Sequence, residues 1–439
     1  MEVVRGGSVS RMLRDVEIPK MFYAVQSFRR EHIAPEEIPA AVKKELYRPK
    51  IAETIQPGMH IAITAGSRGV ANVDIITRTI VEVCKERGAF PFIVPAMGSH
   101  GGANAEGQKE LLAGYGITEE AMGCPVRATM ETVLLGYSEY GKPVYQDKYA
   151  HEADGIIVSC RIKPHNAFRG PYESGVCKMM VVGLGKQKGA ESVHSDGLGN
   201  MARNLPANAK VVAEQSNILF AIPCIENAYD ETALIEAIPA EQIFAREPEL
   251  LTIAFANMPR ILVEEADVLI VDEMGKNYSG TGVDPNISGT WSTEYGKGGL
   301  KVKRTCFLDL TDCSHGNANG MGLADIITAR IFHKLDLDVI YTNCFTSTVL
   351  RSGMMPPAVA TDKEAIQACL RTANGLEHYR DAKVVRIKNT LHIGEIMLSQ
   401  AYYPEVIAGK YPGLSAASVP MELEFDPDGN LVTAMRNDG

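Results

Sequence analysis

The chain has no uninterrupted apolar run approaching the ~18 residues that a membrane-spanning helix needs. Its first twenty residues, MEVVRGGSVSRMLRDVEIPK, contain no continuous apolar segment of the kind found in a secretory signal peptide. These two absences argue against membrane insertion and against export. We therefore expect a soluble, cytoplasmic protein.

An excess of positive charge is also missing. The formal net charge of −10 argues against nucleic acid or an anionic membrane as the main partner. The nine cysteines include no CxxC pair, so neither a zinc site nor a disulfide framework is indicated. HExxH, GxSxG, the GK[ST] of a P-loop and an EF-hand loop are absent too. An enzyme without these motifs would use an unusual cofactor or none.

A chain of 439 residues is too long for one ordinary hydrophobic core, so two or three domains are expected. Apolar runs, polar loops and helical patterns alternate along it, which predicts α/β domains with mostly parallel sheets. This rhythm starts again at residue 266, after a charged stretch interrupted by prolines. We therefore place a domain boundary near residue 258 and predict two domains, residues 1–258 and 259–439.

Several apolar runs are read as buried strands. They are His60–Gly66, Pro91–Pro95, Gly155–Cys160, Asn217–Cys224, Ala266–Asp272, Cys306–Leu310, Leu337–Tyr341 and Val384–Ile387. Helical spacing of apolar residues predicts a second set of elements. These helices are Val73–Arg87, a segment near Asn104–Ala113, the proline-interrupted segment 230–258, Gly322–Leu335 and Asp362–Ala373, the last with a capping-box pattern.

Polar residues directly follow three of the predicted strands. Ser67 and Arg68 follow the first strand, His100 the second and His165 the third. Ligands gather beyond the carboxyl ends of parallel strands, so these side chains could face one crevice. Ser67 and the amides entering the next helix could bind an anion. Histidine suits acid–base chemistry near neutral pH, although a loop histidine that only bonds its own turn is the more common case.

The segment Arg161–His194 places three titratable groups, His165, Lys178 and His194, among glycines. Lys178 lies in an otherwise apolar run, where a lysine either extends to solvent or is buried with a lowered pKa. Extension to solvent is the more common outcome, and His194 alone is unremarkable. The glycines of Gly183–Gly189 have the wrong spacing for GxGxxG. From the residues alone, each group is more readily structural than catalytic.

The order and spacing of five residues together resemble the nickel-pincer lactate racemase family. These residues are Arg68, His100, His165, Lys178 and His194, the last two sixteen positions apart. The resemblance covers most of the chain and is clearest over residues 60–200. It implies two α/β domains with mostly parallel sheets, an N-terminal cofactor-binding and catalytic domain, and an active site in the cleft that the C-terminal domain closes.

The cofactor of that family is a nickel pincer nucleotide, pyridinium-3,5-bisthiocarboxylic acid mononucleotide nickel. The resemblance implies that Lys178 attaches this cofactor covalently and that His194 ligates the nickel. Ser67 and Arg68 are further candidates for binding the cofactor, and Arg68 would also hold the substrate hydroxyl or carboxylate.

The implied activity is that of an isomerase, a racemase or epimerase that inverts C2 of a 2-hydroxy acid. His100 and His165 would be the acid/base pair on the two sides of C2. One histidine removes the hydroxyl proton as hydride leaves C2 for the pyridinium ring, and the other supplies a proton when hydride returns. The implied partners are a small 2-hydroxy acid and the cofactor-maturation proteins, and a homo-oligomer is left open.

The sequence departs from the lactate-specific pattern around these residues. Arg68 lies in Ser-Arg-Gly where the lactate enzymes have Thr-Arg-Pro, and His100 precedes Gly-Gly rather than Arg-Pro. His165 and Lys178 are thirteen positions apart, a few more than in the lactate enzymes. These changes suggest an acid larger than lactate, such as a sugar acid or a dicarboxylate.

In the second domain, Lys276 and Tyr278 occupy the region where the family holds the substrate carboxylate, so they are candidate substrate-binding residues. Two other interpretations stay open. An NAD-type oxidoreductase of hydroxy acids is weakened by the missing GxGxxG loop. A non-catalytic homologue that binds the nucleotide or a sugar acid would not need all four of the histidine and lysine groups.

Overall fold

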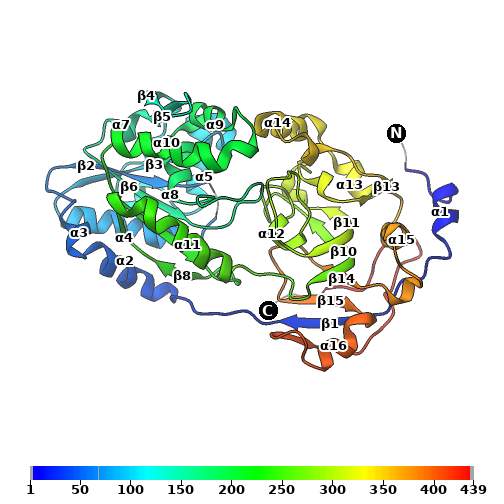
Figure 1. Ribbon diagram of the computed structural model, residues 1–439. Coiled ribbons are helices and arrows are strands. Elements are labelled where there is room, and N and C mark those ends of the chain that lie inside the picture. The colour runs from blue at the N-terminus through cyan, green and yellow to red at the C-terminus, as the bar shows by residue number, and fades with distance from the viewer. Residues whose placement is uncertain (1–2, 68, 436–439) are drawn as a thin grey trace. The chain divides into compact units, whose positions relative to one another are not determined.

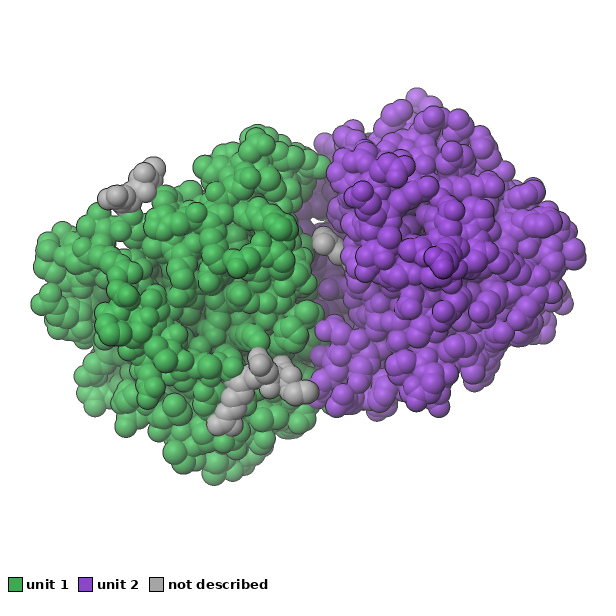
Figure 2. Space-filling view, turned by 180° about the vertical axis from the view of Figure 1, so that it is seen from behind, with its two compact units in different colours: residues 1–28, 259–439 green, residues 29–258 purple. Residues whose placement is uncertain are grey.

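The computed structural model describes residues 3–67 and 69–435, which form two compact units (Figure 1). One unit takes residues 29–258, and the other combines residues 1–28 with residues 259–439 (Figure 2). The early segment joins the later one because β1 (Met21–Gln26) pairs antiparallel with β15 (Glu395–Ser399) and β16 (Leu414–Ala416). The division predicted from sequence at residue 258 had grouped residues 1–28 with the other unit.

A six-stranded sheet forms the centre of unit 29–258, in the order β3-β2-β6-β7-β8, with β9 also paired to β7. The four strands β3, β2, β6 and β7 are parallel, whereas β8 and β9 run antiparallel to β7. The strands of this sheet are β2 (His60–Ala65), β3 (Phe90–Pro95), β6 (Gly155–Arg161), β7 (Ile218–Glu226), β8 (Thr232–Ile235) and β9 (Ile238–Pro239).

The parallel strands are nearly continuous apolar runs in which consecutive residues are buried, as in a sheet covered on both faces. On β2, Ile61 and Ile63 pack in one core with Ile38 of α2 and Ile80 of α4. A separate hairpin joins β4 (Thr132–Tyr137) to β5 (Pro143–Asp147). The helices of this unit are α2 (Ile38–Leu46), α3 (Pro49–Ala52), α4 (Val73–Glu86), α5 (Ala105–Ala113), α6 (Glu119–Met122), α7 (Lys148–His151), α8 (Val176–Lys178), α9 (Lys186–His194), α10 (Met201–Gln215) and α11 (Ile243–Asn257).

The other unit contains an eight-stranded sheet in the order β13-β12-β11-β10-β14-β15-β1-β16. Its first five strands are parallel, and β15, β1 and β16 continue the sheet with antiparallel pairing. Besides the three strands given above, it contains β10 (Glu265–Met274), β11 (Lys301–Leu310), β12 (Ile326–Thr328), β13 (Ala358–Val359) and β14 (Val384–Ile387). The helices are α1 (Ser8–Leu13), α12 (Pro285–Ser288), α13 (Ala329–Lys334), α14 (Leu337–Ser347), α15 (Asp362–Thr372) and α16 (Tyr403–Ile407).

The predicted α/β class with mainly parallel strands is confirmed. Helices α4, α5 and α15 begin and end within two residues of the predicted bounds. At α15 the Thr361 side chain accepts a hydrogen bond from the Glu364 amide at 3.1 Å, as an N-cap residue does. Among the described residues, no helix is both long enough and apolar enough to cross a bilayer.

Three element predictions were wrong. The expected strand at Leu337–Tyr341 is the start of α14, because the Asp336 side chain accepts from the amides of Asp338 and Val339 and caps a helix. Within the expected helix Gly322–Leu335, only α13 is α-helical, and β12 precedes it as a buried parallel strand. The segment 230–258 begins with β8 and β9, which extend the sheet edge before α11 starts.

A buried ion pair joins the start of α9 to the end of β5. Lys186 and Asp147 are both fully buried, with Nζ and Oδ2 3.0 Å apart. The Lys186 ammonium also donates to the Pro95 carbonyl and to Oε1 of Gln108. Burial disfavours the charged form of both partners, raising the pKa of Asp147 and lowering the pKa of Lys186, and their mutual attraction opposes each shift.

A buried carboxyl group supports α8 from behind. Glu247 of α11 is 1% exposed and accepts a hydrogen bond from the Cys177 amide at 2.9 Å. A Cβ atom at Gly175 would overlap Oε1 of Glu247, so a side chain there would displace this carboxylate. Burial raises the pKa of Glu247 to about 7.

Breaking the Lys186–Asp147 pair should destabilise the protein strongly. Lys186→Met leaves a buried carboxylate without its cation, and we expect a loss of about 3–5 kcal/mol in the free energy of unfolding. Adding Asp147→Asn removes that charge and should recover part of the loss. The matched control is Lys148→Met, which breaks the exposed pair with Glu131 and should change stability by less than about 1 kcal/mol. Urea unfolding compares the three variants with wild type, and equal effects of the two lysine substitutions would contradict the argument.

Glu247 should make stability depend on pH in a defined direction. Between pH 4.5, the ordinary pKa of a glutamate, and about 7, the unfolded chain loses this proton while the folded protein keeps it. Stability therefore falls as pH rises through this window, by roughly 1.4 kcal/mol per pH unit. Across this window the free energy of unfolding of Glu247→Gln, relative to that of wild type, should therefore rise by roughly 3 kcal/mol. Glu241→Gln, at an exposed position, is the control. If the stability difference between Glu247→Gln and wild type did not change with pH, the raised pKa of Glu247 would be refuted.

Candidate active site

The carboxyl ends of three neighbouring parallel strands carry the predicted polar residues. The register pairs Ala65 at the end of β2 with Pro95 at the end of β3, and β6 lies on the other side of β2. Ser67, His100 and His165 follow these three strands and therefore lie at one edge of the sheet. The Ser67 hydroxyl and Nδ1 of His100 are hydrogen-bonded to each other.

The predicted Arg68 lies outside the described residues. The roles assigned to it, in binding the cofactor and in holding the substrate, therefore stay predictions. Its neighbour Ser67 is fixed by a second contact, because the Tyr115 hydroxyl donates to the Ser67 carbonyl at 3.1 Å.

Lys178 and His194 lie on two short helices, α8 and α9, that a π-helical turn and residues 184–185 connect. Lys178 ends α8, a π-helical turn at Met179–Gly183 follows, and His194 ends α9. The turn packs tightly under the strand ends, since a Cβ at Gly183 would lie 2.8 Å from the Ala96 carbonyl oxygen. The segment that carries both predicted cofactor residues is thus held against the same sheet edge as Ser67 and His100.

His165 belongs to a loop that closes on itself. The backbones of Lys163 and Ser174 form two hydrogen bonds of 2.9 and 3.3 Å across the base of this loop. Inside it, Nδ1 of His165 accepts a hydrogen bond from the Ala167 amide at 3.1 Å. The rings of His165 and Phe168 lie 4.5 Å apart between centroids.

Partial burial and nearby charges keep His165 and His194 neutral near pH 7. Loss of hydration lowers the pKa of His165 well below 6.5, and the positive charges of Lys178, Arg169 and Lys163 lower it further. Burial also lowers the pKa of His194, whereas the hydrogen bond to the Ala190 carbonyl raises it, and Lys178 lowers it by a smaller amount. These effects show that His165, Lys178 and His194 lie within electrostatic range of one another.

His194 has the tautomer that a metal ligand requires. A carbonyl oxygen can only accept, so Nδ1 of His194 must carry the proton that it donates to the Ala190 carbonyl at 2.6 Å. The lone pair is then on Nε2, as in histidines whose second nitrogen binds a metal. No group of three or more protein ligands occurs within the described part of the chain, so a metal here would need other donors from its own cofactor.

Lys276 and Tyr278 belong to the other compact unit, in the loop after β10. The Lys276 ammonium donates to the Gly280 carbonyl at 2.6 Å and to Oδ1 of Asn343 at 3.2 Å. The Tyr278 hydroxyl donates to Glu273 at 2.5 Å, and burial together with this bond raises its pKa to about 12. Tyr278 is therefore protonated at neutral pH. The substrate-binding roles of both residues stay predictions.

Sequence reasoning missed three supporting residues of the site. Glu173 is 1% exposed and lies within the His165 loop, Glu247 supports α8, and Lys186 anchors α9. Lys186 and Glu173 do occur in the glycine-rich segment that the sequence analysis singled out. Their burial depends on contacts with residues distant in sequence, so spacing within the segment gives no sign of it.

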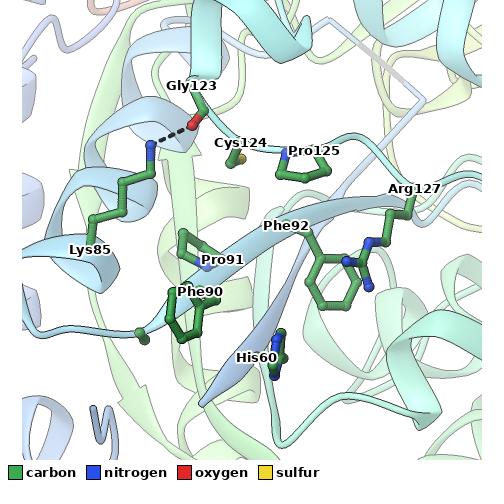
Figure 3. Close-up of a pocket in the computed structure, with 10 residues that line it drawn as sticks. His60, Lys85, Phe90, Pro91, Phe92, Gly123, Cys124, Pro125 and Arg127 are labelled. Carbon is green, nitrogen blue, oxygen red and sulfur yellow. Dashed lines mark hydrogen bonds between the residues drawn. The ribbon is translucent and has the colours of Figure 1, made fainter. Parts of the chain in front are cut away.

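A separate shallow pocket of about 330 Å³ lies at the amino ends of β2 and β3 (Figure 3). Lys85 donates to the Gly123 carbonyl there, and the Arg127 guanidinium lies 4.4 Å above the centre of the Phe92 ring. None of the predicted site residues is among its described lining residues. The pocket is therefore at the opposite edge of the sheet from Ser67, His100 and His165.

Comparisons with known proteins place these observations in a family. Residues 13–204 match the model of the lactate racemase N-terminal domain. The lactate racemase apoprotein from Thermoanaerobacterium thermosaccharolyticum is similar at 15% identity, over 80% of this chain and 81% of that chain, with a TM-score of 0.43. A protein from Thermotoga maritima is similar at 12% identity, over 64% of this chain and 72% of that chain, with a TM-score of 0.47.

The comparison with curated proteins gave no match. The family assignment therefore depends on the N-terminal domain match, which includes Ser67, His100, His165, Lys178 and His194. Over residues 13–204, the chain therefore carries a domain of the lactate racemase N-terminal type.

Proposed function

We propose that the protein inverts C2 of a 2-hydroxy acid by reversible hydride transfer to a nickel pincer nucleotide tethered at Lys178. The observation that carries this proposal is the juxtaposition of His165, Lys178 and His194 at one sheet edge, within a lactate racemase N-terminal domain. When bound, the cofactor would supply the hydride acceptor, and the chain would supply attachment, orientation and proton transfer.

The residues present fit such a cofactor. Lys178 ends the short helix α8 at the carboxyl end of β6, and its amine would form the covalent link. His194 offers an Nε2 lone pair as the protein ligand to nickel, because its Nδ1 proton is engaged by Ala190. The substrate hydroxyl would be met by Ser67 and His100 on one side. His165, which follows β6, would act on it from the other.

The substrate would be an acid larger than lactate. The loop between His165 and Lys178 is longer than in the lactate enzymes, and its own contacts hold it in a fixed shape. We assign substrate contacts to Arg68, Lys276 and Tyr278, of which the two cations would pair with a carboxylate. A sugar acid or a dicarboxylate is the class that we would test first.

Removing the tether should abolish cofactor attachment. We expect Lys178→Ala, produced together with the cofactor-maturation proteins, to lack the nucleotide-sized mass adduct and all racemase activity. Intact-mass measurement followed by peptide mapping detects the adduct. Lys188→Ala is the matched control, because this nearby lysine contacts the Tyr145 ring rather than the candidate site. An adduct that persists in Lys178→Ala would show that the tether is elsewhere.

The hydride route can be tested with the matured enzyme and a panel of 2-hydroxy acids and aldonates. Inversion at C2 identifies the substrate. With substrate that carries deuterium at C2, reacted in ordinary water, we expect the product to retain the deuterium, because hydride moves without exchange with solvent. Replacement of the deuterium by solvent hydrogen would indicate proton abstraction from carbon and would exclude the proposed route.

A further inference from the structure

A buried lysine at the start of α9 has a backbone conformation that lysine rarely adopts. Lys186 has a φ of 54°, in the left-handed region that favours glycine, and its side chain is fully buried. Strained residues of this kind persist where the surrounding contacts hold them, and they cluster at functional sites. The partners of the Lys186 ammonium therefore indicate what this conformation serves.

Three acceptors surround the ammonium group of Lys186. They are Oδ2 of Asp147 at 3.0 Å, Oε1 of Gln108 at 3.1 Å and the Pro95 carbonyl. An ammonium group has three N–H donors, so these acceptors use all of them. The side chains of Asp147, Lys186 and Gln108 are each 0% exposed, so bulk water does not compete for these bonds.

The contact with Lys186 fixes the orientation of the Gln108 amide. An ammonium group can only donate, so the atom that faces it must be the amide oxygen, and the amide nitrogen points the other way. Nε2 of Gln108 donates to the Gly98 carbonyl at 3.0 Å and to the His100 carbonyl at 3.2 Å. Both N–H groups of this amide thus bind the backbone of the loop that follows β3.

The loop after β3, which carries the candidate acid/base His100, is held through its amides as well. The Gly98 amide donates to the Gly183 carbonyl at 3.3 Å, and the His100 amide donates to the Met97 carbonyl at 3.1 Å. Gly98 and His100 are therefore each fixed through both the amide and the carbonyl. The backbone position of His100 in turn determines where its ring meets the Ser67 hydroxyl.

These contacts give a physical reason for the unusual backbone of Lys186. Glycine would adopt the same φ without strain. It would also leave the Asp147 carboxylate and Oε1 of Gln108 buried without a donor, which is unfavourable for both groups. The strained conformation thus places a cation at the one point from which it reaches both side chains.

We infer that Gln108 and Lys186 are positioning residues for His100 and form a buried relay from the start of α9, the helix that ends at His194, to the backbone of the acid/base histidine. This inference rests on the proposed function, in which His100 acts on the substrate hydroxyl. Both side chains are fully buried, so they act through the loop. Proton transfer needs its groups within hydrogen-bond reach, so a small displacement of His100 slows it.

The relay can be tested in apoprotein. Gln108→Met keeps the size of the side chain and removes both N–H donors. We expect amide hydrogen exchange in peptides that cover residues 96–103 to become about 10–100-fold faster, because two buried hydrogen bonds no longer hold the loop. Mass spectrometry of these peptides measures the rate.

Gln367→Met is the matched control for this measurement. Gln367 is also buried, and its Nε2 donates to the Val16 carbonyl at 2.9 Å in the other compact unit. Exchange over residues 96–103 should stay at the wild-type rate in this variant. Wild-type exchange in Gln108→Met, or equal acceleration in the two variants, would overturn the inference.

A second substitution decides the point if Gln108→Met fails to fold, as judged by circular dichroism. The carboxyl group of Gln108→Glu keeps a bond to Lys186. Whether ionised or protonated, it can donate at most one of the two hydrogen bonds to the loop. Faster exchange over residues 96–103 in this variant supports the relay, and exchange at the wild-type rate overturns it.

The part played by Lys186 is tested by a double-mutant cycle. The background Lys186→Met/Asp147→Asn removes the cation together with its buried counter-charge. Oε1 of Gln108 then loses its partner, so the amide is no longer oriented and should hold the loop less well. We expect Gln108→Met to accelerate loop exchange about threefold less, or lower still, in this background than in wild type. Equal acceleration in both would remove Lys186 from the relay.

Turnover of the matured enzyme distinguishes positioning from a general loss of structure. We expect Gln108→Met to lower kcat about 10–100-fold, because His100 is displaced from the substrate hydroxyl. The solvent deuterium isotope effect on kcat should rise above that of wild type, because proton transfer becomes slower relative to the other steps. Partial unfolding would reduce the active fraction without changing this isotope effect. A lower kcat with an unchanged isotope effect would therefore overturn the inference.

Failure of this inference is distinguishable from failure of the proposed function. If wild-type matured enzyme inverted none of the tested acids, the proposed function would be wrong, whereas exchange in the apoprotein would still decide whether Gln108 and Lys186 hold the His100 loop. If inversion were observed but Gln108→Met left loop exchange unchanged, the function would stand and the inference would be rejected.

Discussion

The close approach of the Met179–Gly183 turn to the ends of β2 and β3 is the constraint on which the candidate site depends. Gly183 has no side chain, so the turn can lie against the Ala96 carbonyl. A Cβ at Gly98, on the loop after β3, would lie 3.3 Å from the Val182 carbonyl oxygen, a less severe contact. Because the turn joins α8 to α9, this contact fixes the positions of Lys178 and His194 together. A side chain at Gly183 would push the segment away from Ser67 and His100.

Three positive side chains lie near His165, although one of them, Arg169, is paired with the buried Glu173. Lys163, Arg169 and Lys178 all act on His165 with positive charge, although the chain as a whole is acidic. Such a local field favours carboxylates and phosphates and opposes protonation of the histidines. At His194 the hydrogen bond to the Ala190 carbonyl acts in the other direction and raises the pKa, although burial lowers it more.

Much of the fold could be predicted from the sequence, since local signals agreed with it. The apolar runs that became β2, β3 and β6 are short and bounded by glycine or polar residues, and α4 shows clear helical spacing. The predictions failed where a single side chain or a distant strand decided the outcome. Asp336 turned an apolar run into α14, and pairing with β7 made β8 a strand inside a charged segment.

For the site, sequence order located the strand-end residues but gave no information on their environment. Nδ1 of His165 meets the amide of Ala167, whereas Nδ1 of His194 meets the carbonyl of Ala190, and such backbone partners leave no signature in composition. The buried partners Glu173 and Glu247 were invisible for a related reason. Whether a carboxylate is solvated or enclosed depends on elements that lie far away along the chain.

The pairing of β1 with β15 also constrains how the protein is made. Residues 29–258 are continuous in sequence, so this unit can fold as soon as it has left the ribosome. Strand β1 emerges first, but its partner strand follows roughly 370 residues later, or roughly 20–75 s at ordinary rates of synthesis. During that interval its apolar sequence, MFYAV, has no sheet to join. The first strand made is thus among the last to be paired, and the nascent chain carries an exposed strand edge throughout most of its synthesis.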